Sequence, residues 1–172
     1  QVPRSEWKRA AEHGLLCPSA PPGLGGAGAD FLYSVAIIEE LAEQAVGGFF
    51  LALHNDVVFP YLASLGTPEQ KRRWIPGCIQ GDHVLALAMT EPGAGSDLAR
   101  ITTRAVRSGD HYVVDGAKTF ISNGQTADLF VVAVRTSLDP ARAHAGLSLV
   151  VIGADRPGFM RGKSLGKIGL HA

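Results

Sequence analysis

Leu87–Asp97 reads LAMTEPGAGSD, an apolar run that passes into a loop of proline and glycine and ends in two small polar residues. Further along the chain, Lys118–Gly124 (KTFISNG) predicts a second strand, at a spacing that suits a neighbour of the first strand in one sheet. A strand that ends in glycines leaves backbone N–H groups free, and such backbone concavities bind anions such as phosphate. Phe120 and Ser122 stand two positions apart, which places them on the same face of a strand. Together the two segments predict a site for a flat cofactor that carries phosphate.

The composition is that of a folded protein without a strong charge bias. The chain has 172 residues, 46% of them apolar, which is enough for one sizeable domain or two small ones. Its 16 basic and 16 acidic residues give a formal net charge of zero. The triplet Lys71-Arg72-Arg73 is interpreted as a solvated helix face, so nucleic-acid binding is not expected.

Neither the cysteines nor the histidines are spaced as metal ligands. Cys17 and Cys78 are far apart in sequence, which argues against a disulfide framework or a zinc site and fits a reducing compartment. The six histidines include no pair four apart on a helix, so no metal site is expected, and His54 is interpreted as a buried or interface histidine with its hydrogen bonds satisfied.

The two ends of the chain and its hydropathy add three expectations. No apolar run approaches the length of about 20 residues that spans a bilayer, and Gln1–Arg4 lacks a signal-peptide pattern. Because no methionine begins the chain, we expect a trimmed or processed start. Because it ends directly after a strand-like segment, we also expect an incomplete C-terminus.

Residues 1–82 have helical periodicity. Asp30 predicts a helix cap, and the helix that follows buries one face at positions three and four apart. The predicted face comprises Ile37, Ile38, Leu41 and Ala45.

Two further helices are predicted before residue 82. One begins after Gly47-Gly48 and contains Pro60, which should kink it. Thr67–Gln70 is a capping box with proline at the first helical position, and it predicts a helix through Trp74 whose end is disturbed by Pro76 and Gly77.

Residues 83–172 have the period of two and the β-branched residues of strands. Ser108–Asp110 and Asp115-Gly116 predict tight turns between antiparallel strands, and residues 137–145 form a longer polar connection. Strands without intervening helices favour an antiparallel barrel or sandwich over a Rossmann unit. The predicted class is therefore α+β, with an N-terminal helical domain (1–82) followed by an antiparallel, barrel-like β domain (83–172). The predicted strands are carried by Tyr112–Val114, Phe130–Val134 and Leu147–Ile152.

Both segments, in this order, resemble the flavin-binding segments of the acyl-CoA dehydrogenase family. Three further stretches are similar to that family, and with them the resemblance covers nearly the whole chain: His54–Lys71, Gly109–Gly116 and Pro157–Leu170. The resemblance implies the first two of the family's three domains, without the C-terminal helical domain that follows them.

The resemblance also implies that FAD is the cofactor. Met89 and Thr90 would hydrogen-bond the pyrimidine edge of the isoalloxazine ring, with the Thr90 hydroxyl and amide reaching N1 and O2. Ser96 would lie near the pyrophosphate of FAD and the pantetheine arm of an acyl-CoA, so it is a predicted substrate-binding residue too. The long glycine loop favours FAD, which has a pyrophosphate, over FMN.

The resemblance also implies that the second segment contacts the flavin. The resemblance places Phe120 against the ring and lets Ser122, which replaces a common threonine, donate to N5 and O4. Such a donor would matter because N5 accepts hydride and develops charge during reduction. The predicted cofactor-binding set is Leu87, Ala88, Met89, Thr90, Gly95, Ser96, Phe120, Ile121 and Ser122.

The implied activity is α,β-dehydrogenation of an acyl-CoA thioester, with electrons passed to electron-transfer flavoprotein. The family's base is a glutamate of the C-terminal domain, so no catalytic residue is assigned here, and Glu91 is interpreted as a loop residue. The resemblance implies a homotetramer in the bacterial cytoplasm or the mitochondrial matrix, with a lean toward long-chain members. Gly47–Ala52 would border the acyl pocket, although core packing explains that stretch equally well.

Two alternatives remain open at the level of sequence. The same fold serves acyl-CoA oxidases and flavin monooxygenases, in which oxygen re-oxidises the flavin. A non-catalytic fragment or binding module would keep the fold without turnover.

Overall fold

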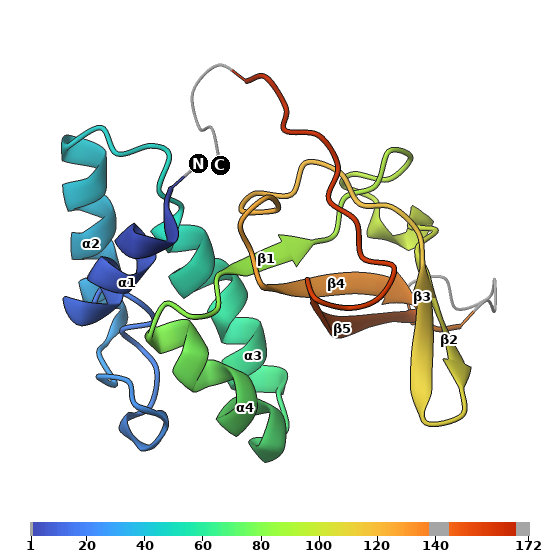
Figure 1. The fold of residues 1–172 in the computed structure, drawn as a ribbon, viewed down its shortest axis with the longest axis horizontal. Coiled ribbons are helices and arrows are strands. Elements are labelled where there is room, and N and C mark those ends of the chain that lie inside the picture. The colour runs from blue at the N-terminus through green and yellow to red at the C-terminus, as the bar shows by residue number, and fades with distance from the viewer. Residues whose placement is uncertain (1, 138–144, 168–172) are drawn as a thin grey trace.

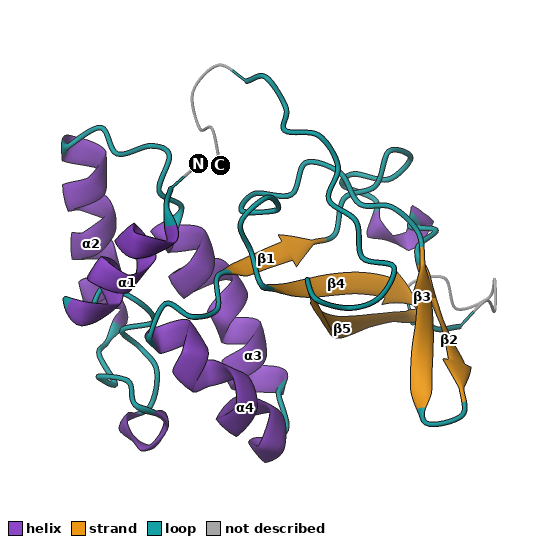
Figure 2. Ribbon diagram, viewed as in Figure 1, coloured by secondary structure: helices purple, strands orange, loops and turns teal. Residues whose placement is uncertain are grey.

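The computed structural model describes residues 2–137 and 145–167. Helices gather at one side of the molecule and strands at the other, and β1 leads from the helical side into the sheet (Figures 1 and 2). This arrangement confirms the predicted α+β class with helices first. The helices are α1 (Arg4–Glu12), α2 (Phe31–Glu43), α3 (Phe59–Leu65) and α4 (Pro68–Ile79), and the strands are β1 (Leu85–Ala88), β2 (Arg104–Ser108), β3 (His111–Asp115), β4 (Leu129–Arg135) and β5 (Leu147–Gly153).

Both predicted helix caps are present. The Asp30 carboxylate accepts a hydrogen bond from the Leu32 amide at 2.9 Å and so begins α2. At α4, the Gln70 amide donates to the Thr67 hydroxyl at 3.2 Å, and the Gln70 side chain accepts from the Thr67 amide at 2.9 Å. The prediction that Pro76 disturbs the end of this helix after Trp74 is wrong, because α4 contains Pro76 and continues to Ile79.

The predicted kink at Pro60 takes the form of a change in helix type. A π-helix runs from Leu53 to Val58 and passes directly into α3, where Pro60 lies in the first turn. Proline has no N–H and cannot donate the regular helical hydrogen bond. Because the π turn ends just before it, Pro60 lies in the first turn of α3, where the missing hydrogen bond lowers the stability of the helix little. The π turn carries His54, Asn55 and Asp56.

The predicted buried face of α2 is only partly correct. Ile37 and Leu41 pack against the core, but Ile38 is 38% exposed, and Ala45 lies beyond the helix end with a left-handed φ of 54°. The one fully buried side chain of α2 is Ser34, which donates to the Asp56 carboxylate at 2.6 Å.

The described residues form a sheet of five strands, and two parallel pairings, β1 with β4 and β2 with β4, correct the prediction of a purely antiparallel sheet. The pairs β4–β5 and β2–β3 are antiparallel, but β1 and β4 are parallel, with Leu85 opposite Leu129 and Ala88 opposite Val132. The chain between β1 and β4 crosses over through loops and the β2–β3 hairpin, so local turn signals did not indicate a parallel pair. The hairpin pairs with β4 only through Arg104 and Arg135 and then projects away from the sheet (Figure 1).

The core joins the helices to the sheet through β1. Leu85 packs in a cluster with Phe59 and Ile75, whereas its neighbour Ala86 packs in a second cluster with Trp7 and Phe130. This alternation follows from the period of two in a strand. Because β1 is buried on both faces, its start and the loop that follows it are held in fixed positions.

Candidate functional site

The loop after β1 forms a short turn that leaves its glycines at the surface. The Glu91 amide donates to the Ala94 carbonyl at 2.9 Å, and the Ala94 amide donates back to the Glu91 carbonyl at 3.1 Å. Asp97 then caps a 3-10 turn, Leu98–Arg100. A Cβ atom built on Gly93 or Gly95 would meet no other atom within 4 Å, so this side of the loop borders open space.

The segment Lys118–Gly124 lies beside β1, but the prediction that it is a strand is wrong. The Thr119 amide donates to the Thr90 carbonyl at 2.9 Å, and the Asn123 side chain donates to the Leu85 carbonyl at 3.2 Å. Between these two contacts the backbone turns, because Phe120 and Asn123 adopt left-handed φ angles of 57° and 61°. The segment therefore covers the free edge of β1 as an irregular turn, and Phe120 and Ser122 are not related by a strand's pleat.

The predicted cofactor-binding residues differ in how far they are exposed to solvent. Phe120 is 71% exposed, an unusual environment for a phenylalanine next to a core strand. Gly95 and Ser96 are also exposed, whereas Ala88 is buried in β1. The remaining five are half-buried: Leu87, Met89, Thr90, Ile121 and Ser122.

Glu91 is the polar centre of this region. The residue is 5% exposed, and its carboxylate accepts four hydrogen bonds. One oxygen accepts from the amide and the hydroxyl of Thr102 at 2.6 and 2.7 Å, and the other accepts from the Thr103 amide and from Lys118 Nζ, each at 2.9 Å. Burial acts to raise the pKa of the Glu91 carboxyl, but the hydrogen bonds from Thr103, Thr102 and Lys118 outweigh burial and hold that pKa well below its usual range. A carboxylate held in its charged form is a poor proton acceptor, in agreement with its interpretation as a loop residue.

The base of the β2–β3 hairpin is closed by a glycine that contacts Thr103. Gly116 follows β3 with a φ of 151°, and a Cβ atom there would lie 2.4 Å from the Thr103 hydroxyl. Only glycine permits so close an approach. Asp115-Gly116 is therefore a contact point between two segments, not the tight turn predicted from the sequence, whereas Gly109 does form the predicted turn between β2 and β3.

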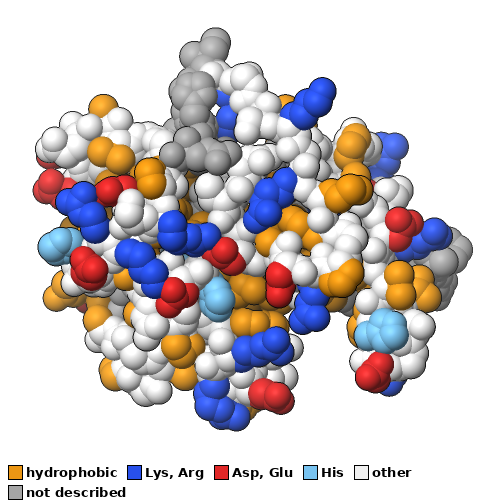
Figure 3. Space-filling model, viewed as in Figure 1, with side chains coloured by type: hydrophobic (Ala, Val, Ile, Leu, Met, Phe, Trp, Pro, Cys, Tyr) orange, Lys and Arg blue, Asp and Glu red, His pale blue; other side chains and the backbone are white. Residues whose placement is uncertain are grey.

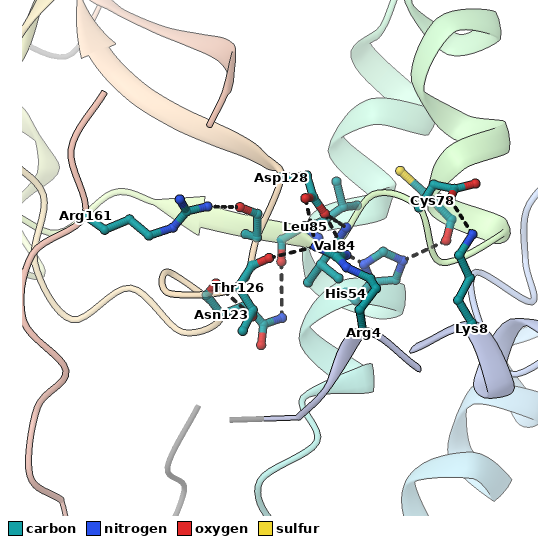
Figure 4. Close-up of polar contacts among 12 residues, drawn as sticks. Arg4, Lys8, His54, Cys78, Val84, Leu85, Asn123, Thr126, Asp128 and Arg161 are labelled. Atoms are coloured by element: carbon teal, nitrogen blue, oxygen red, sulfur yellow. Dashed lines mark hydrogen bonds and ion pairs between the residues drawn. The ribbon is translucent and has the colours of Figure 1, made fainter. Parts of the chain in front are cut away.

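His54 forms a second polar centre, where the helices meet the start of β1 (Figure 4). Its Nδ1 accepts from the Leu85 amide at 3.2 Å, so its proton is on Nε2, which lies 3.2 Å from the Cys78 carbonyl and 3.4 Å from the Cys17 sulfur. Burial lowers the pKa of His54 to about 4. This environment confirms the interpretation of His54 as a buried histidine with satisfied hydrogen bonds.

An aspartate at the sheet also stabilises the junction between the helices and the start of β1. Asp128 accepts from the Val84 amide at 2.7 Å and pairs with Arg4 of α1 at 2.7 Å (Figure 4).

The two cysteines are buried and form no disulfide, and burial raises the pKa of the Cys78 thiol to about 12. Buried thiols with raised pKa values are unreactive, so we interpret both cysteines as core residues.

Other parts of the described chain show no feature that indicates a second functional site. On the face seen in Figure 3, acidic and basic side chains are interspersed without a large patch of one sign. Within residues 2–137 and 145–167, no cluster of three potential metal ligands is present, and no helix has the length and hydropathy needed to cross a bilayer. A groove between α4 and the neighbouring ends of β4 and β5 contains none of the predicted site residues; Trp74, His83, Leu129 and Arg156 are among the residues that line it.

Sequence reasoning missed the residues that hold the two loops together. Lys118 and Asn123 lie in the second predicted segment but had no predicted role, and Thr102 and Thr103 lie in neither segment. Lys118 and Glu91 are 27 positions apart and Asn123 and Leu85 are 38 apart, so local sequence patterns could not predict these contacts.

Comparisons with known proteins match the whole chain. The family model "Acyl-CoA dehydrogenase, N-terminal domain" matches residues 1–82, and "Acyl-CoA dehydrogenase, middle domain" matches residues 86–172. The mitochondrial long-chain specific acyl-CoA dehydrogenase of Rattus norvegicus is 40% identical over 172 residues, which is 100% of this chain and 40% of that protein.

Solved structures give the same result. An acyl-CoA dehydrogenase from Geobacillus kaustophilus superposes with a TM-score of 0.96 at 53% identity, over 99% of this chain and 45% of that one. A glutaryl-CoA dehydrogenase from Mycobacterium smegmatis in complex with FADH2 has a TM-score of 0.85 at 29% identity, over 99% of this chain and 42% of that one. The chain thus spans less than half the length of these relatives.

Proposed function

Because this chain belongs to the acyl-CoA dehydrogenase family, we propose that it supplies the flavin-binding part of an FAD-dependent enzyme that dehydrogenates acyl-CoA thioesters. Residues 1–82 and 83–172 are proposed as its helical and β domains. Electron-transfer flavoprotein is the proposed electron acceptor, and a homotetramer the proposed assembly. Relatives from a mitochondrion and from a bacterium support either the mitochondrial matrix or the bacterial cytoplasm as its location.

One observation carries this proposal: two loops meet along the free edge of β1 and leave an aromatic ring exposed beside them. The Thr119 amide donates a hydrogen bond to the Thr90 carbonyl, and the next residue, Phe120, is 71% exposed. The loop containing Gly93 and Gly95 borders open space on the same stretch of chain. An exposed ring, polar groups at a strand end and an open glycine loop fit the ring system and the pyrophosphate of FAD.

We assign the roles as follows. Thr90 and Met89 bind the pyrimidine edge of the flavin, with Leu87 and Ala88 supporting them from β1. Gly95 and Ser96 bind the pyrophosphate, and Ser96 also contacts the pantetheine arm of the substrate. Phe120 and Ile121 pack against the ring, and the Ser122 hydroxyl donates to the position where negative charge develops. Each residue thus binds or orients, and none is assigned to proton transfer.

The chemistry follows from that division. When bound, FAD supplies the hydride acceptor for the β-carbon of the acyl chain. For proton removal from the α-carbon we propose a base outside these 172 residues, as the resemblance to the family implies. Glu91 is excluded from that role by its four hydrogen bonds and its lowered pKa.

The preference for long acyl chains is proposed from the rat relative. Part of the stretch Gly47–Ala52 belongs to the core, because Leu51 is buried and the Phe49 ring packs edge-on against Trp7 at 4.8 Å. The exposed Gly47 and the half-buried Gly48, Phe50 and Ala52 are the members left to border an acyl pocket.

The proposal is tested on the protein at its natural length. Mass spectrometry of the denatured protein should release FAD, and anaerobic mixing with a long-chain acyl-CoA should bleach the flavin absorbance. Re-oxidation should be fast with electron-transfer flavoprotein and slow with oxygen. Rapid re-oxidation by oxygen would instead identify an oxidase or monooxygenase. A protein that remains colourless after incubation with FAD and inert toward acyl-CoA would identify a non-catalytic module.

Ser122→Ala gives a residue-level test of the same site. Losing one preorganised donor should slow flavin reduction by about 10- to 1000-fold while the protein stays folded. The matched control is Ser108→Ala, at the exposed turn of the β2–β3 hairpin. Equal reduction rates in the Ser122→Ala variant and the unmodified protein, at saturating substrate, would remove Ser122 from the site.

A further inference from the structure

We propose that Lys118 is a positioning residue of the flavin site, which it serves by fixing the peptide group between Met89 and Thr90. The inference rests on the proposed FAD site and adds to it a residue to which no role has been assigned. It starts from the fact that a lysine ammonium group lies under the loop, next to the strand end, instead of in solvent.

The contacts of Lys118 are few and directed. Its Nζ donates to the Met89 carbonyl at 2.9 Å and to the Glu91 carboxylate at 2.9 Å. The side chains of Lys118 and Glu91 are only 10% and 4% exposed. A buried ion pair of this kind holds a single geometry, because either partner alone would be a buried charge without compensation.

Two consecutive residues of one loop are thereby held by two consecutive residues of the other. Lys118 binds the carbonyl of Met89, and the Thr119 amide binds the carbonyl of Thr90 at 2.9 Å. In a trans peptide the C=O and N–H bonds point in opposite directions, and no cis peptide occurs among the described residues. With the Met89 carbonyl on Lys118, the Thr90 N–H is directed away from Lys118.

Glu91 makes this arrangement rigid. Its carboxylate is fixed by Thr102 and Thr103, which precede the β2–β3 hairpin, while Lys118 follows the hairpin. Two separate backbone segments are therefore joined to the loop of Glu91 through one carboxylate. The hairpin between them can be displaced only if these buried hydrogen bonds break.

The lysine also acts electronically on that peptide. A cation that binds a carbonyl oxygen polarises the peptide and strengthens its N–H as a donor, because hydrogen bonds in a chain reinforce one another. The Thr90 N–H is the group proposed to face the pyrimidine edge of the flavin, where the reduced ring carries negative charge. Lys118 should therefore strengthen FAD binding and stabilise the reduced form more than the oxidised form.

The test compares Lys118→Met with Lys118→Arg and with the control Lys8→Met. Lys118→Met keeps the apolar stem and removes the donor, Lys118→Arg keeps a charged donor, and Lys8 pairs with Asp82 on the exposed surface of α1. The measurements are the dissociation constant of FAD from apoprotein, the flavin midpoint potential, and amide exchange of Met89–Glu91 in apoprotein.

We expect Lys118→Met to weaken FAD binding by about 10- to 100-fold, the range for losing a charge-assisted hydrogen bond, and to make the midpoint potential more negative. Exchange of the Met89–Glu91 amides should become faster, Lys118→Arg should recover part of each effect, and Lys8→Met should match the unmodified protein. An unchanged dissociation constant and potential in Lys118→Met would overturn the role. If the unmodified protein itself binds no FAD, the proposed function fails and not this inference alone.

Lys118→Met leaves Glu91 without its cation and so risks unfolding. The pair variant Glu91→Gln with Lys118→Met removes both charges, which avoids an uncompensated buried charge. A folded pair variant with weakened FAD binding and a more negative potential supports positioning. A folded pair variant that binds FAD like the unmodified protein shows that the ion pair serves stability only, and it overturns the proposal.

Discussion

The two polar centres of this chain use buried titratable groups in opposite ways. His54 lies between helices and sheet, where burial lowers its pKa to about 4 and each ring nitrogen has a backbone partner. Glu91 lies under the loops after β1, where hydrogen bonds keep its carboxylate charged despite burial. One centre is neutral and enclosed by the core; the other is charged and pairs with Lys118, in the loop that carries the exposed Phe120.

This contrast separates the part of the chain that maintains the fold from the part that presents a surface. A neutral histidine satisfied by backbone groups has no capacity left for a ligand. The carboxylate of Glu91 is also saturated, but it is saturated by groups that position a loop edge, and the loop edge itself stays open. A buried charge therefore marks the site here because of what it holds, not because it reacts.

Removing the charged centre should have the largest effect on stability. Glu91→Ala leaves Lys118 buried without its anion and deprives Thr102 and Thr103 of their acceptor. The free energy of unfolding should fall by about 3–5 kcal/mol, the range for breaking a buried ion pair from one side. Urea denaturation measures this change.

The matched control is Glu39→Ala on the exposed side of α2, which should change the free energy of unfolding by less than about 0.5 kcal/mol. If Glu91→Ala lowered the free energy of unfolding as little as this control, the carboxylate would not organise the loops. The proposed contrast between Glu91 and His54 would then be wrong.

The neutral centre should be broken by acid. The pKa of His54 is lower in the folded chain, about 4, than its usual value of 6.5, so the unfolded chain binds more protons between these values. Stability from His54 is therefore complete above pH 6.5 and is lost as the pH falls toward 4. The loss should reach about 3 kcal/mol by the lower end of that range.

Urea denaturation at a series of pH values, on the chain and on His54→Gln, isolates this contribution. The variant should be less stable near neutral pH but lose less stability on acidification. Burial raises the pKa of Asp56, which opposes this trend equally in both proteins. The lowered pKa of Glu91 adds to the trend near and below its usual value of 4.5, again equally in both proteins. Parallel curves for the two proteins would show that His54 is not the group that titrates.

An intermediate effect is expected at the glycine that closes the hairpin onto Thr103. Gly116→Ala places a methyl group within 2.6 Å of the Thr103 Cα atom at a positive φ. Overpacking together with backbone strain should lower the free energy of unfolding by about 1–3 kcal/mol. Gly109→Ala, which meets no atom within 4 Å but also has a positive φ, separates strain from overpacking. Equal losses in the two variants would show that the contact with Thr103 is unimportant.

Local signals in the sequence predicted most of the elements but not how distant segments meet. Asp30 and the Thr67–Gln70 box found their helix starts because a cap is a contact between residues a few positions apart. The strands at β3, β4 and β5 followed from period and β-branching. The parallel pairing of β1 with β4 depends on a crossover that no local signal encodes.

The candidate site divides along the same line. Resemblance indicated both loops, and they do lie together along β1. The turn at Phe120 was missed because KTFISNG has the composition of a strand, and tertiary contacts at Thr119 and Asn123 override that preference. The polar connection predicted at residues 137–145 falls largely outside the described residues.

The smallest effect on stability is expected at Phe120, and it sharpens the contrast between the enclosed and the open centre. The side chain is 71% exposed, so Phe120→Ala should change the free energy of unfolding by less than about 0.5 kcal/mol. The control Phe130→Ala, at a ring that is 5% exposed on β4 and packs against Phe159, should cost about 3–5 kcal/mol. If Phe120 is the ring that packs on the flavin, the same variant should weaken FAD binding several-fold, in the range of a single aromatic pair, without a change in folding. Isothermal titration of apoprotein with FAD and urea denaturation of each variant measure the two quantities separately. A large loss of stability in Phe120→Ala would mean that the ring is part of the core, and unchanged FAD binding would mean that Phe120 does not pack on the flavin.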